Sequence, residues 1–208
     1  MAIHHDEIER RASGLLYDVY NTGDPSWSKA RRLLRKINLC ATCDEARNLF
    51  ESLLGKFPSS AAIVPPFYCD LGPQIELGEN AFLNMDCLIL DEAKVVIGDR
   101  TLIGPRCSFY TPVHPIDAKV RATGLEYARA IVIGKDVWMG GGCTINPGVT
   151  IGDESIIGSG SVVTRDIPSG VFAAGNPCRV IRVLGEEEKA RSRKDYEEYL
   201  AFRKARAM

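Results

Sequence analysis

The sequence predicts a mainly β fold, a parallel β-helix built from six-residue repeats, with helical segments at both ends. The first observation is a strict period. Every sixth position from 133 to 163 holds an aliphatic residue or methionine: Ile133, Met139, Ile145, Ile151, Ile157 and Val163. The second observation is that a small or β-branched residue stands two positions before each of these repeat positions. An amphipathic helix repeats at about 3.6 residues and a half-buried strand at about 2, so neither explains a period of six. A solenoid with one short side per hexapeptide does.

Residues 1–58 predict an N-terminal helical segment. Apolar residues at helical spacing between positions 8 and 19 indicate a first helix, which ends at the turn over 21–25. Ser26 or Ser28 is the expected N-cap of a second helix, and Asp44 is that of a third helix, which stops at Gly55. Prolines that follow this segment separate it from the repeats.

The sequence of residues 59–184 predicts the β-helix domain. A less regular run of the repeat comes first, at the positions Leu77, Leu83, Ile89, Ile97, Ile103 and Phe109. Eight residues instead of six separate Ile89 from Ile97, which indicates a small bulge near 91–94. The period is lost over residues 111–129, and an irregular stretch of this length inside a solenoid is typically functional. Because three hexapeptides make a coil, we expect roughly five coils with one inserted loop.

Residues 185–208 form a highly charged C-terminal segment. The stretch 185–206 predicts a helix that caps the open end of the coil. A short solenoid also leaves flat outer sides, which inward-facing aliphatic residues do not cover. We therefore expect association through these sides, most simply as a closed homotrimer.

Composition excludes several classes of protein. With 26 basic and 27 acidic side chains, the chain has no charge excess that favours nucleic acid or an anionic membrane. No apolar run approaches the roughly 20 residues of a membrane span, and the polar, acidic start is not typical of a signal peptide. Seven scattered cysteines argue against a disulfide framework and favour the cytoplasm. The CxxC of Cys40 and Cys43 is a weak metal signal, because no second pair accompanies it.

The motifs of the chain together resemble the hexapeptide-repeat acetyltransferases of the maltose, galactoside and nodulation-factor type. The resemblance is carried by GLLYD at 14–18, ARRLLRKIN at 30–38, PPFYCDLG at 65–72, ENAFLNMDCLILDE at 79–92, VHPID at 113–117 and the block 133–182. The Cys-Asp pair at 69–70 looks closest to the maltose type. This resemblance implies a left-handed β-helix, acetyl-CoA as co-substrate without a required metal, and a sugar as acceptor. It also implies a homotrimer with active sites between subunits.

His114 is the main catalytic candidate. The chain has three histidines, and His4 and His5 lie near the N-terminus, whereas His114 lies in the loop that interrupts the repeat. An imidazole titrates near neutral pH and can accept a proton from a sugar hydroxyl. The resemblance implies that His114 is the general base for direct acetyl transfer from coenzyme A. Its other ring nitrogen needs an acceptor, for which Glu126 and a backbone carbonyl are the two candidates; Glu126 is also a candidate substrate ligand.

Other polar residues are candidates for the acceptor side. Asn84 occupies a repeat position where a purely structural repeat prefers glycine or alanine, and its amide can steady the reacting hydroxyl or the developing oxyanion. Asp70, Asp91 and Glu92 are expected to bind sugar hydroxyls, and Asp18 matches an acceptor-binding aspartate of the family. Each is alternatively a turn or capping residue. Galactoside enzymes carry serine at the position of Asp70, and some relatives carry aspartate at that of Glu92, so the sugar stays open.

The coenzyme side is expected along residues 138–182. Gly140, Gly141 and Gly142 remove side chains where a pantetheine arm needs contact with the backbone. By the resemblance, the N–H of Gly141 is an oxyanion donor. The other residues that the resemblance places at the coenzyme are Trp138, Ser159, Thr164, Arg165, Arg179 and Arg182. A packing role suits the tryptophan equally well, and the last two arginines are candidates to bind phosphate.

Three alternatives to a sugar O-acetyltransferase compete with this interpretation. An acetyltransferase acting on a drug, an amino acid or an amino sugar uses a similar histidine. A zinc-dependent β-helix carbonic anhydrase needs three histidine ligands, whereas the solenoid contains His114 alone. A non-catalytic scaffold is the third, and the presence of His114, Asn84 and the triple glycine argues against it.

Overall fold

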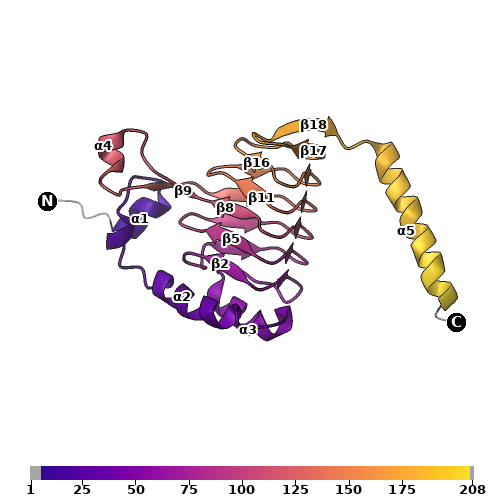
Figure 1. The fold of residues 1–208 in the computed structure, drawn as a ribbon, viewed down its shortest axis with the longest axis horizontal. Helices are drawn as coiled ribbons and strands as arrows, with labels where there is room; N and C mark the ends of the chain where they lie inside the picture. Colours follow the sequence, from indigo (N-terminus) through magenta and orange to yellow (C-terminus); the bar gives the residue numbers. More distant parts are fainter. Residues whose placement is uncertain (1–5, 207–208) are drawn as a thin grey trace.

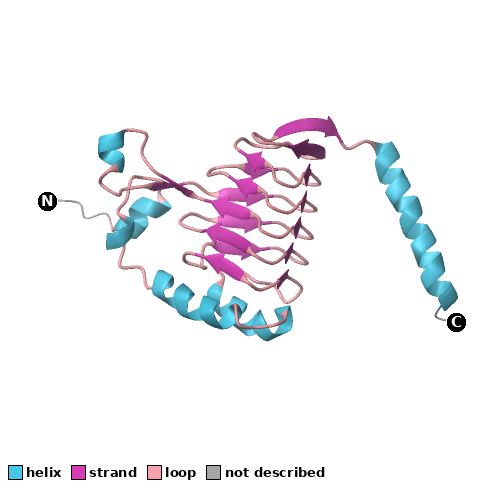
Figure 2. Ribbon diagram, in the orientation of Figure 1, coloured by secondary structure: helices cyan, strands magenta, loops and turns pink. Residues whose placement is uncertain are grey.

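A computed structural model describes residues 6–206 as a parallel β-solenoid, with short helices against its first coil and a long helix beyond its last (Figure 1). The strands stack in three parallel sheets, one for each side of the coil (Figure 2). Among residues 6–206, no helix has the length and apolar character that crossing a bilayer requires. The mainly β solenoid predicted from the six-residue period is confirmed.

The first sheet holds six parallel strands and a final antiparallel one. In spatial order these are β1 (Ala62–Ile63), β4 (Phe82–Leu83), β7 (Leu102–Ile103), β12 (Trp138–Met139), β15 (Ile156–Ile157), β17 (Val171–Ala174) and β18 (Arg179–Val183). The second is β14 (Thr150–Ile151), β11 (Ile131–Ile133), β6 (Val95–Ile97) and β3 (Ile75–Leu77). The third is β16 (Val162–Val163), β13 (Thr144–Ile145), β8 (Ser108–Tyr110), β5 (Cys87–Leu90) and β2 (Phe67–Cys69). The first sheet therefore spans six coils, one more than expected.

The repeat positions form the interior of the solenoid. Met139 pairs in register with Ile103 on one neighbouring strand and with Ile157 on the other. All three side chains are buried in one continuous apolar core. Because successive coils stack in register, each repeat position lies directly above the previous one. The six-residue period is thus the spacing that aims one side chain per hexapeptide at the core.

The expected bulge at 91–94 contains a structural carboxylate. Asp91 is fully buried and accepts backbone N–H groups from Leu71 at 2.8 Å and Gly72 at 2.6 Å. Thr111 also binds this corner, because its hydroxyl accepts the N–H of Ala93 at 2.9 Å. This corner is therefore tied to the preceding coil by Asp91 and to the following coil by Thr111.

The N-terminal segment is helical but differs in detail from the expectation. Helix α1 (Glu7–Ala12) stops well before Val19, since Gly14 takes a φ of +66° and the chain then runs extended to a short 3₁₀ turn, η1 (Val19–Asn21). The leader turns because Tyr17 forms a β-bridge with Glu126 of the inserted loop. Local periodicity does not reveal this pairing.

Two further helices cover the first coil. Helix α2 (Ser26–Ile37) begins without a side-chain cap, so neither predicted serine cap is correct. Helix α3 (Cys43–Leu53) is capped by Thr42, whose hydroxyl accepts the N–H of Glu45 at 3.2 Å, and not by Asp44. Their buried faces join the solenoid core, where the rings of Phe50 and Phe67 lie 5.6 Å apart. The helices therefore close this end of the coil.

The C-terminal helix does not cap the other end. Helix α5 (Glu186–Arg206) is present as predicted, but it extends away from the solenoid and none of its residues is buried (Figure 1). Strand β18 pairs antiparallel with β17 and is the outermost strand at that end. The expectation of a capping helix is therefore not met within this chain: β18 takes the outermost position, and the apolar side chains of the helix, such as Tyr199 and Leu200, are exposed.

Candidate active site

His114 is positioned by a hairpin that interrupts the solenoid. Strand β9 (Pro112–Val113) pairs antiparallel with β10 (Tyr127–Ala128), and the short helix α4 (Ala118–Arg121) lies between them. His114 is the first residue after β9. This hairpin projects from the coil toward α1, so residues from the leader and from the loop lie side by side (Figure 1). The loss of the repeat at 111–129 corresponds to this projection.

The ring of His114 is oriented by a backbone carbonyl. Its Nδ1 atom lies 3.3 Å from the carbonyl oxygen of Leu125, and a carbonyl can only accept, so Nδ1 carries the hydrogen in the neutral ring. The other nitrogen, Nε2, is then an acceptor. It lies 3.9 Å from Oε2 of Glu126, and 54% of the histidine side chain is exposed. Of the two candidates for orienting the ring, the backbone carbonyl takes that position, while Glu126 lies on the Nε2 side.

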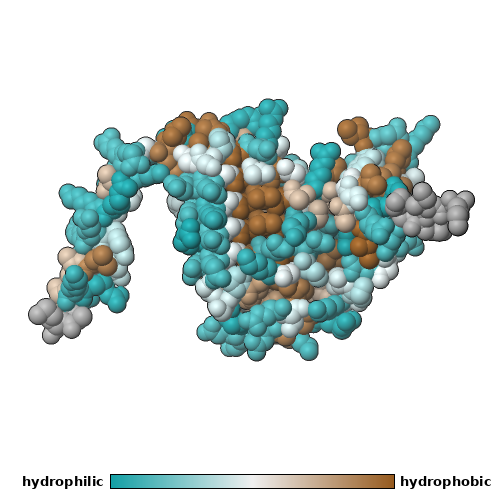
Figure 3. Space-filling view, turned by 180° about the vertical axis from the view of Figure 1, so that it is seen from behind, coloured by the Kyte–Doolittle hydropathy of each residue, from teal (hydrophilic) through white to brown (hydrophobic). Residues whose placement is uncertain are grey.

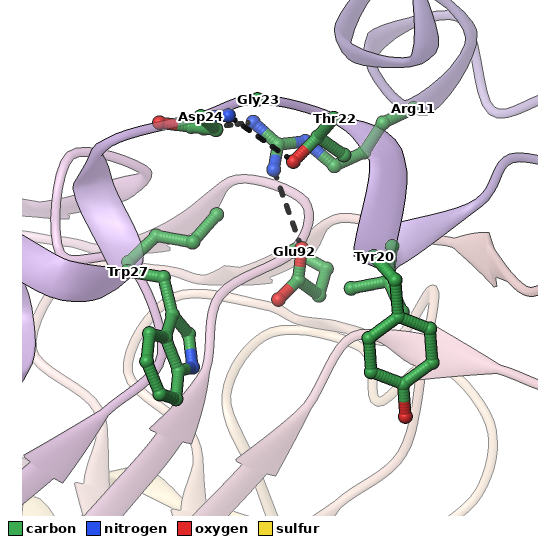
Figure 4. Close-up of a pocket in the computed structure, with 9 residues that line it drawn as sticks. Arg11, Tyr20, Thr22, Gly23, Asp24, Trp27 and Glu92 are labelled. Carbon is green, nitrogen blue, oxygen red and sulfur yellow. Dashed lines mark hydrogen bonds and ion pairs between the residues drawn. The ribbon is translucent and has the colours of Figure 1, made fainter.

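A buried polar network runs from Glu126 into the leader. The hydroxyl of Tyr17 donates a short hydrogen bond to Oε1 of Glu126 and lies 3.4 Å from Oε2 of Glu92. Arg11 lies 3.4 Å from the same Glu92 oxygen and forms an ion pair with Asp24 at 2.8 Å. Figure 4 shows the guanidinium of Arg11 between these two carboxylates. The network links the leader, the corner after β5 and the inserted loop.

Burial changes the ionisation of this network. The pKa of Glu92 is raised to about 7 by burial and, to a lesser extent, by the carboxylates of Asp70, Glu126 and Asp91, against the lowering effect of Arg11. Burial and the hydrogen bond to Glu126 also raise the pKa of the Tyr17 phenol far above its usual value. Tyr17 therefore stays protonated as a donor, and Glu92 exchanges a proton near neutral pH.

A cavity of about 410 Å³ opens beside Glu92. Its lining residues are Arg11, Val19, Tyr20, Thr22, Gly23, Asp24, Trp27, Leu71 and Glu92 (Figure 4). The rings of Tyr20 and Trp27 are both largely exposed, and such faces suit the apolar faces of sugar rings. Sequence reasoning identified Glu92 but missed Arg11, Tyr17 and Trp27. The motif GLLYD contains Tyr17, but only its neighbours Leu15 and Leu16 belong to the predicted helical stripe, and local spacing gives no signal for the partners of Tyr17.

The predicted acidic residues separate into different environments. Asp70 forms a 2.8 Å ion pair with Arg31, and burial raises the pKa of its carboxyl. Asp91 is enclosed and bound by backbone N–H groups, so its expected role as a sugar ligand is corrected to a structural one. Asp18 caps η1, accepting the N–H of Tyr20 at 3.0 Å and the side-chain amide of Asn21 at 2.6 Å.

Asn84 lies at the corner after β4. The repeat position is occupied by Leu83, which points into the core, so the assignment of Asn84 to a repeat position is corrected. Its Oδ1 accepts the N–H of Met85 at 2.8 Å. This bond fixes the direction of the side chain and leaves its NH₂ group as the donor.

The triple glycine follows β12 at the outer corner of the coil. A Cβ at Gly140 would lie 2.7 Å from the backbone nitrogen of Ser159, and one at Gly141 would lie 3.1 Å from the carbonyl oxygen of Pro105. Gly142 has a φ of +72°. Coil stacking and a turn therefore give these glycines a structural reason of their own, and their predicted contact with the pantetheine arm stays a prediction. Among residues 6–206, the N–H of Gly141 meets no hydrogen-bond acceptor.

The remaining predicted coenzyme residues lie on the coils nearest α5. Trp138 points outward from β12 with 55% of its surface exposed, and Thr164 and Arg165 are exposed just after β16. Ser159 follows β15 and packs against the corner of Gly140. On β18, the guanidinium of Arg179 donates to the carbonyl of Cys178 at 2.8 Å. Arg182 forms a short ion pair with Glu188 and lies over the ring of Phe172.

Sequence comparisons relate the chain to known acetyltransferases. Residues 130–165 match the family model of the bacterial transferase hexapeptide (six repeats). A putative acetyltransferase of Saccharomyces cerevisiae is 46% identical, over 87% of this chain and 94% of its own. The galactoside O-acetyltransferase of Escherichia coli is 41% identical over 74% of this chain and 75% of its own. Nodulation protein L of Rhizobium meliloti is 44% identical, over 78% of this chain and 92% of that protein.

Solved structures show the same relationship. A maltose O-acetyltransferase from Clostridium difficile 630 superposes with a TM-score of 0.83 and 39% identity, covering 86% of this chain and 97% of that one. A galactoside acetyltransferase in complex with coenzyme A superposes with a TM-score of 0.83 and 37% identity, covering 87% of this chain and 92% of that one. A hexapeptide-repeat acetyltransferase from Vibrio cholerae complexed with acetyl coenzyme A superposes with a TM-score of 0.80 and 37% identity, covering 86% of this chain and 98% of that one.

Proposed function

The chain belongs to the hexapeptide-repeat acetyltransferases, and on that premise we propose that it moves an acetyl group from acetyl-CoA to a hydroxyl group of a sugar. It is an acyltransferase, and acetyl-CoA is its co-substrate. The finer assignment, a maltose-, glucose- or galactoside-like acceptor, is supported by the names of its relatives and by the aromatic and carboxylate lining of the cavity at Glu92. The cytoplasm stays the expected compartment.

His114 is the proposed general base, and its geometry is the observation that carries the proposal. Because Leu125 holds Nδ1, the Nε2 atom is left unprotonated and exposed to a bound hydroxyl. Nε2 takes the hydroxyl proton while the hydroxyl oxygen forms a bond to the thioester carbonyl carbon. The carbon–sulfur bond then breaks, and the imidazolium returns its proton to the leaving thiolate. The acetyl group thus passes directly from one substrate to the other.

Two donors are proposed to stabilise the oxyanion that forms on the carbonyl oxygen. The N–H of Gly141 has no partner among the described residues, so it can donate a hydrogen bond to the oxyanion without losing an existing bond. The NH₂ group of Asn84 is the second, since its Oδ1 is fixed by Met85. Trp138, Ser159, Thr164, Arg165, Arg179 and Arg182 are proposed to contact the coenzyme, with residues 1–58 on the acceptor side.

We expect a homotrimer in which the coenzyme-binding residues of one subunit meet the acceptor-side residues of its neighbour. Strands β4, β7, β12 and β15 pair in register, so Phe82, Leu102, Trp138 and Ile156 form an outward apolar row. Of these, Leu102 and Trp138 are about half exposed. Figure 3 shows apolar residues gathered along the middle of the solenoid. Covering such a row with another copy of the chain removes apolar surface from water.

An acceptor panel tests the proposed function. Purified protein is mixed with acetyl-CoA and with glucose, maltose, a galactoside, an amino sugar, an amino acid and an aminoglycoside, and release of free thiol is followed. We expect release that depends on the neutral sugars, with an O-acetyl product identified by NMR. Turnover confined to amines, with an N-acetyl product, would replace the sugar hydroxyl by an amine acceptor. If none of the compounds in the panel stimulates release of free thiol, the proposed function is contradicted.

A further inference from the structure

We propose that Glu126 binds the hydroxyl next to the one being acetylated, and that Tyr17 holds Glu126 in position to do so. The inference rests on the proposed function, because it names which acceptors the site prefers: sugars and polyols with two neighbouring hydroxyl groups. It adds to the reaction one specificity-determining residue, Glu126, and one positioning residue, Tyr17.

The first step of the argument is the placement of two acceptor atoms. Nε2 of His114 and Oε2 of Glu126 lie 3.9 Å apart on the same side of the imidazole. A single hydroxyl carries one hydrogen and can donate it to only one of them. An acceptor molecule that satisfies both atoms therefore needs a second donor beside the first. Two neighbouring hydroxyls of a sugar meet this requirement, with the reacting one at His114 and the other at Glu126.

The second step is that Tyr17 fixes the position of the Glu126 carboxylate. Its Oε1 takes the hydrogen of the Tyr17 hydroxyl, so Oε2 is the oxygen that faces the histidine. The backbones of these two residues also exchange N–H to carbonyl bonds of 3.0 and 3.1 Å. Tyr17 is 1% exposed and Glu126 is 6% exposed, so water does not replace these bonds. The carboxylate is preorganised for a ligand.

The third step concerns charge. Glu126 and Glu92 approach the same phenol, and Arg11 balances the second carboxylate rather than the first. No cation of the chain forms an ion pair with Glu126 among residues 6–206, apart from the histidine itself when protonated. Its Oε2 atom, on the side of the histidine, is therefore a strong hydrogen-bond acceptor whose charge is not neutralised by an ion pair. A neutral hydroxyl binds this oxygen without a clash of charge.

Deoxy analogues of the sugar acetylated best test the role of Glu126. The acetylated position is first identified by NMR, and kcat/KM is then compared for the parent sugar, an analogue lacking the neighbouring hydroxyl, and one lacking a remote hydroxyl. A hydrogen bond to a charged group corresponds to about a 10- to 100-fold loss for the first analogue. Glu126→Ala should remove this discrimination. Equal discrimination by the variant and the wild type would overturn the proposal.

A double-mutant cycle tests Tyr17. Tyr17→Phe removes only the hydroxyl, and we expect kcat/KM for the sugar to fall roughly 3- to 30-fold with an unchanged KM for acetyl-CoA. In the Glu126→Ala background, Tyr17→Phe should not lower kcat/KM further. If Tyr17 acted independently of Glu126, the fold-losses of the two single variants would multiply in the double variant. Tyr196→Phe, on α5, is the matched control. If Tyr17→Phe does not fold, the deoxy series with Glu126→Ala still decides the proposal.

The two proposals fail in different ways. A wild-type protein that acetylates no sugar overturns both. A protein that acetylates sugars, loses activity in His114→Ala and yet accepts the neighbouring deoxy analogue as well as the parent sugar overturns only the role of Glu126.

Discussion

The Nδ1 atom of His114 lies 3.3 Å from the carbonyl oxygen of Leu125, across the hairpin that interrupts the solenoid. This contact fixes which nitrogen of the ring carries hydrogen, and it directs Nε2 toward Glu126 and the leader. The contact needs only a backbone carbonyl, so it does not depend on the identity of residue 125. The loop thus orients a proton acceptor by its backbone conformation.

Replacing this histidine should stop the reaction but not the fold. His114→Ala removes the proton acceptor, and kcat with the best sugar is expected to fall by about 10²- to 10⁴-fold. The side chain is half exposed, so thermal unfolding and the affinity for acetyl-CoA should change little. Lys119→Ala, in the same loop, is the control. Sugar-dependent turnover at the wild-type rate in His114→Ala would exclude the histidine as base.

Glu92 should make stability depend on pH. Burial raises its pKa from 4.5 to about 7, so between these values the native protein holds a proton that the unfolded chain has lost. The free energy of unfolding therefore falls as the pH rises through this window. Glu92→Gln has no such proton, and its stability relative to wild type should increase by up to about 3 kcal/mol from pH 5 to 8.

Urea unfolding of wild type and Glu92→Gln at several pH values measures this difference. All samples need one protein concentration, because the unfolding of an oligomer depends on it. Stability curves that stay parallel from pH 5 to 8 would show that Glu92 titrates in the native protein as it does in the unfolded chain.

The close stacking of coils should make Gly98 intolerant of any side chain. A Cβ there would lie 2.5 Å from the carbonyl oxygen of Gly134 on the next coil, and that backbone is itself paired. Gly98→Ala is expected to destabilise the protein by about 2 kcal/mol or more, measured by denaturant unfolding. Gly185→Ala, where nothing lies within 4 Å of the added carbon, should change stability much less. Equal effects of the two variants would contradict this explanation.

The apolar row on the first sheet should be an interface. Leu102→Asp places a charge in the row and is expected to convert the trimer to monomers, as measured by light scattering after size exclusion. Activity should fall with it, because the site is expected between subunits. Leu39→Asp replaces another exposed leucine, between α2 and α3, and should leave the assembly intact. A trimer that survives Leu102→Asp would place the interface on another side of the coil.

Much of the fold could be predicted because its signal is local. Ile145 and Ile151 are separated by six residues in the chain and by one side of the coil in space, so the sequence period directly reports the geometry. The same holds for the interruption at 111–129, where the loss of the period marks the hairpin. Helix ends were predicted less well. Thr42 caps α3 in place of Asp44, because several residues near a helix start can serve and the tertiary packing selects among them.

The partners of the site residues could not be predicted in the same way. Asp91 and Glu92 are adjacent and acidic, and both looked like surface ligands of a sugar. The fold encloses Asp91 among backbone N–H groups and turns Glu92 toward Tyr17 and Arg11. Nothing in the two residue types distinguishes these outcomes. Tyr17 lies in the segment predicted as the first helix, and its pairing with Glu126 could not be predicted because it joins positions that are far apart in the chain.

The sequence alone determined that this protein is a six-residue-repeat solenoid with one interrupted side and a single histidine in the interruption. Those features follow from spacing between near neighbours, which the chain states directly. The tertiary structure decided what surrounds that histidine: Leu125 behind it, Glu126 beside it, and Tyr17, Glu92 and Arg11 beyond. The contacts of Tyr17 with Glu92, of Arg11 with Glu92 and of Tyr17 with Glu126 join residues 75, 81 and 109 positions apart. They exist only because the leader packs against the corner after β5 and against the inserted loop.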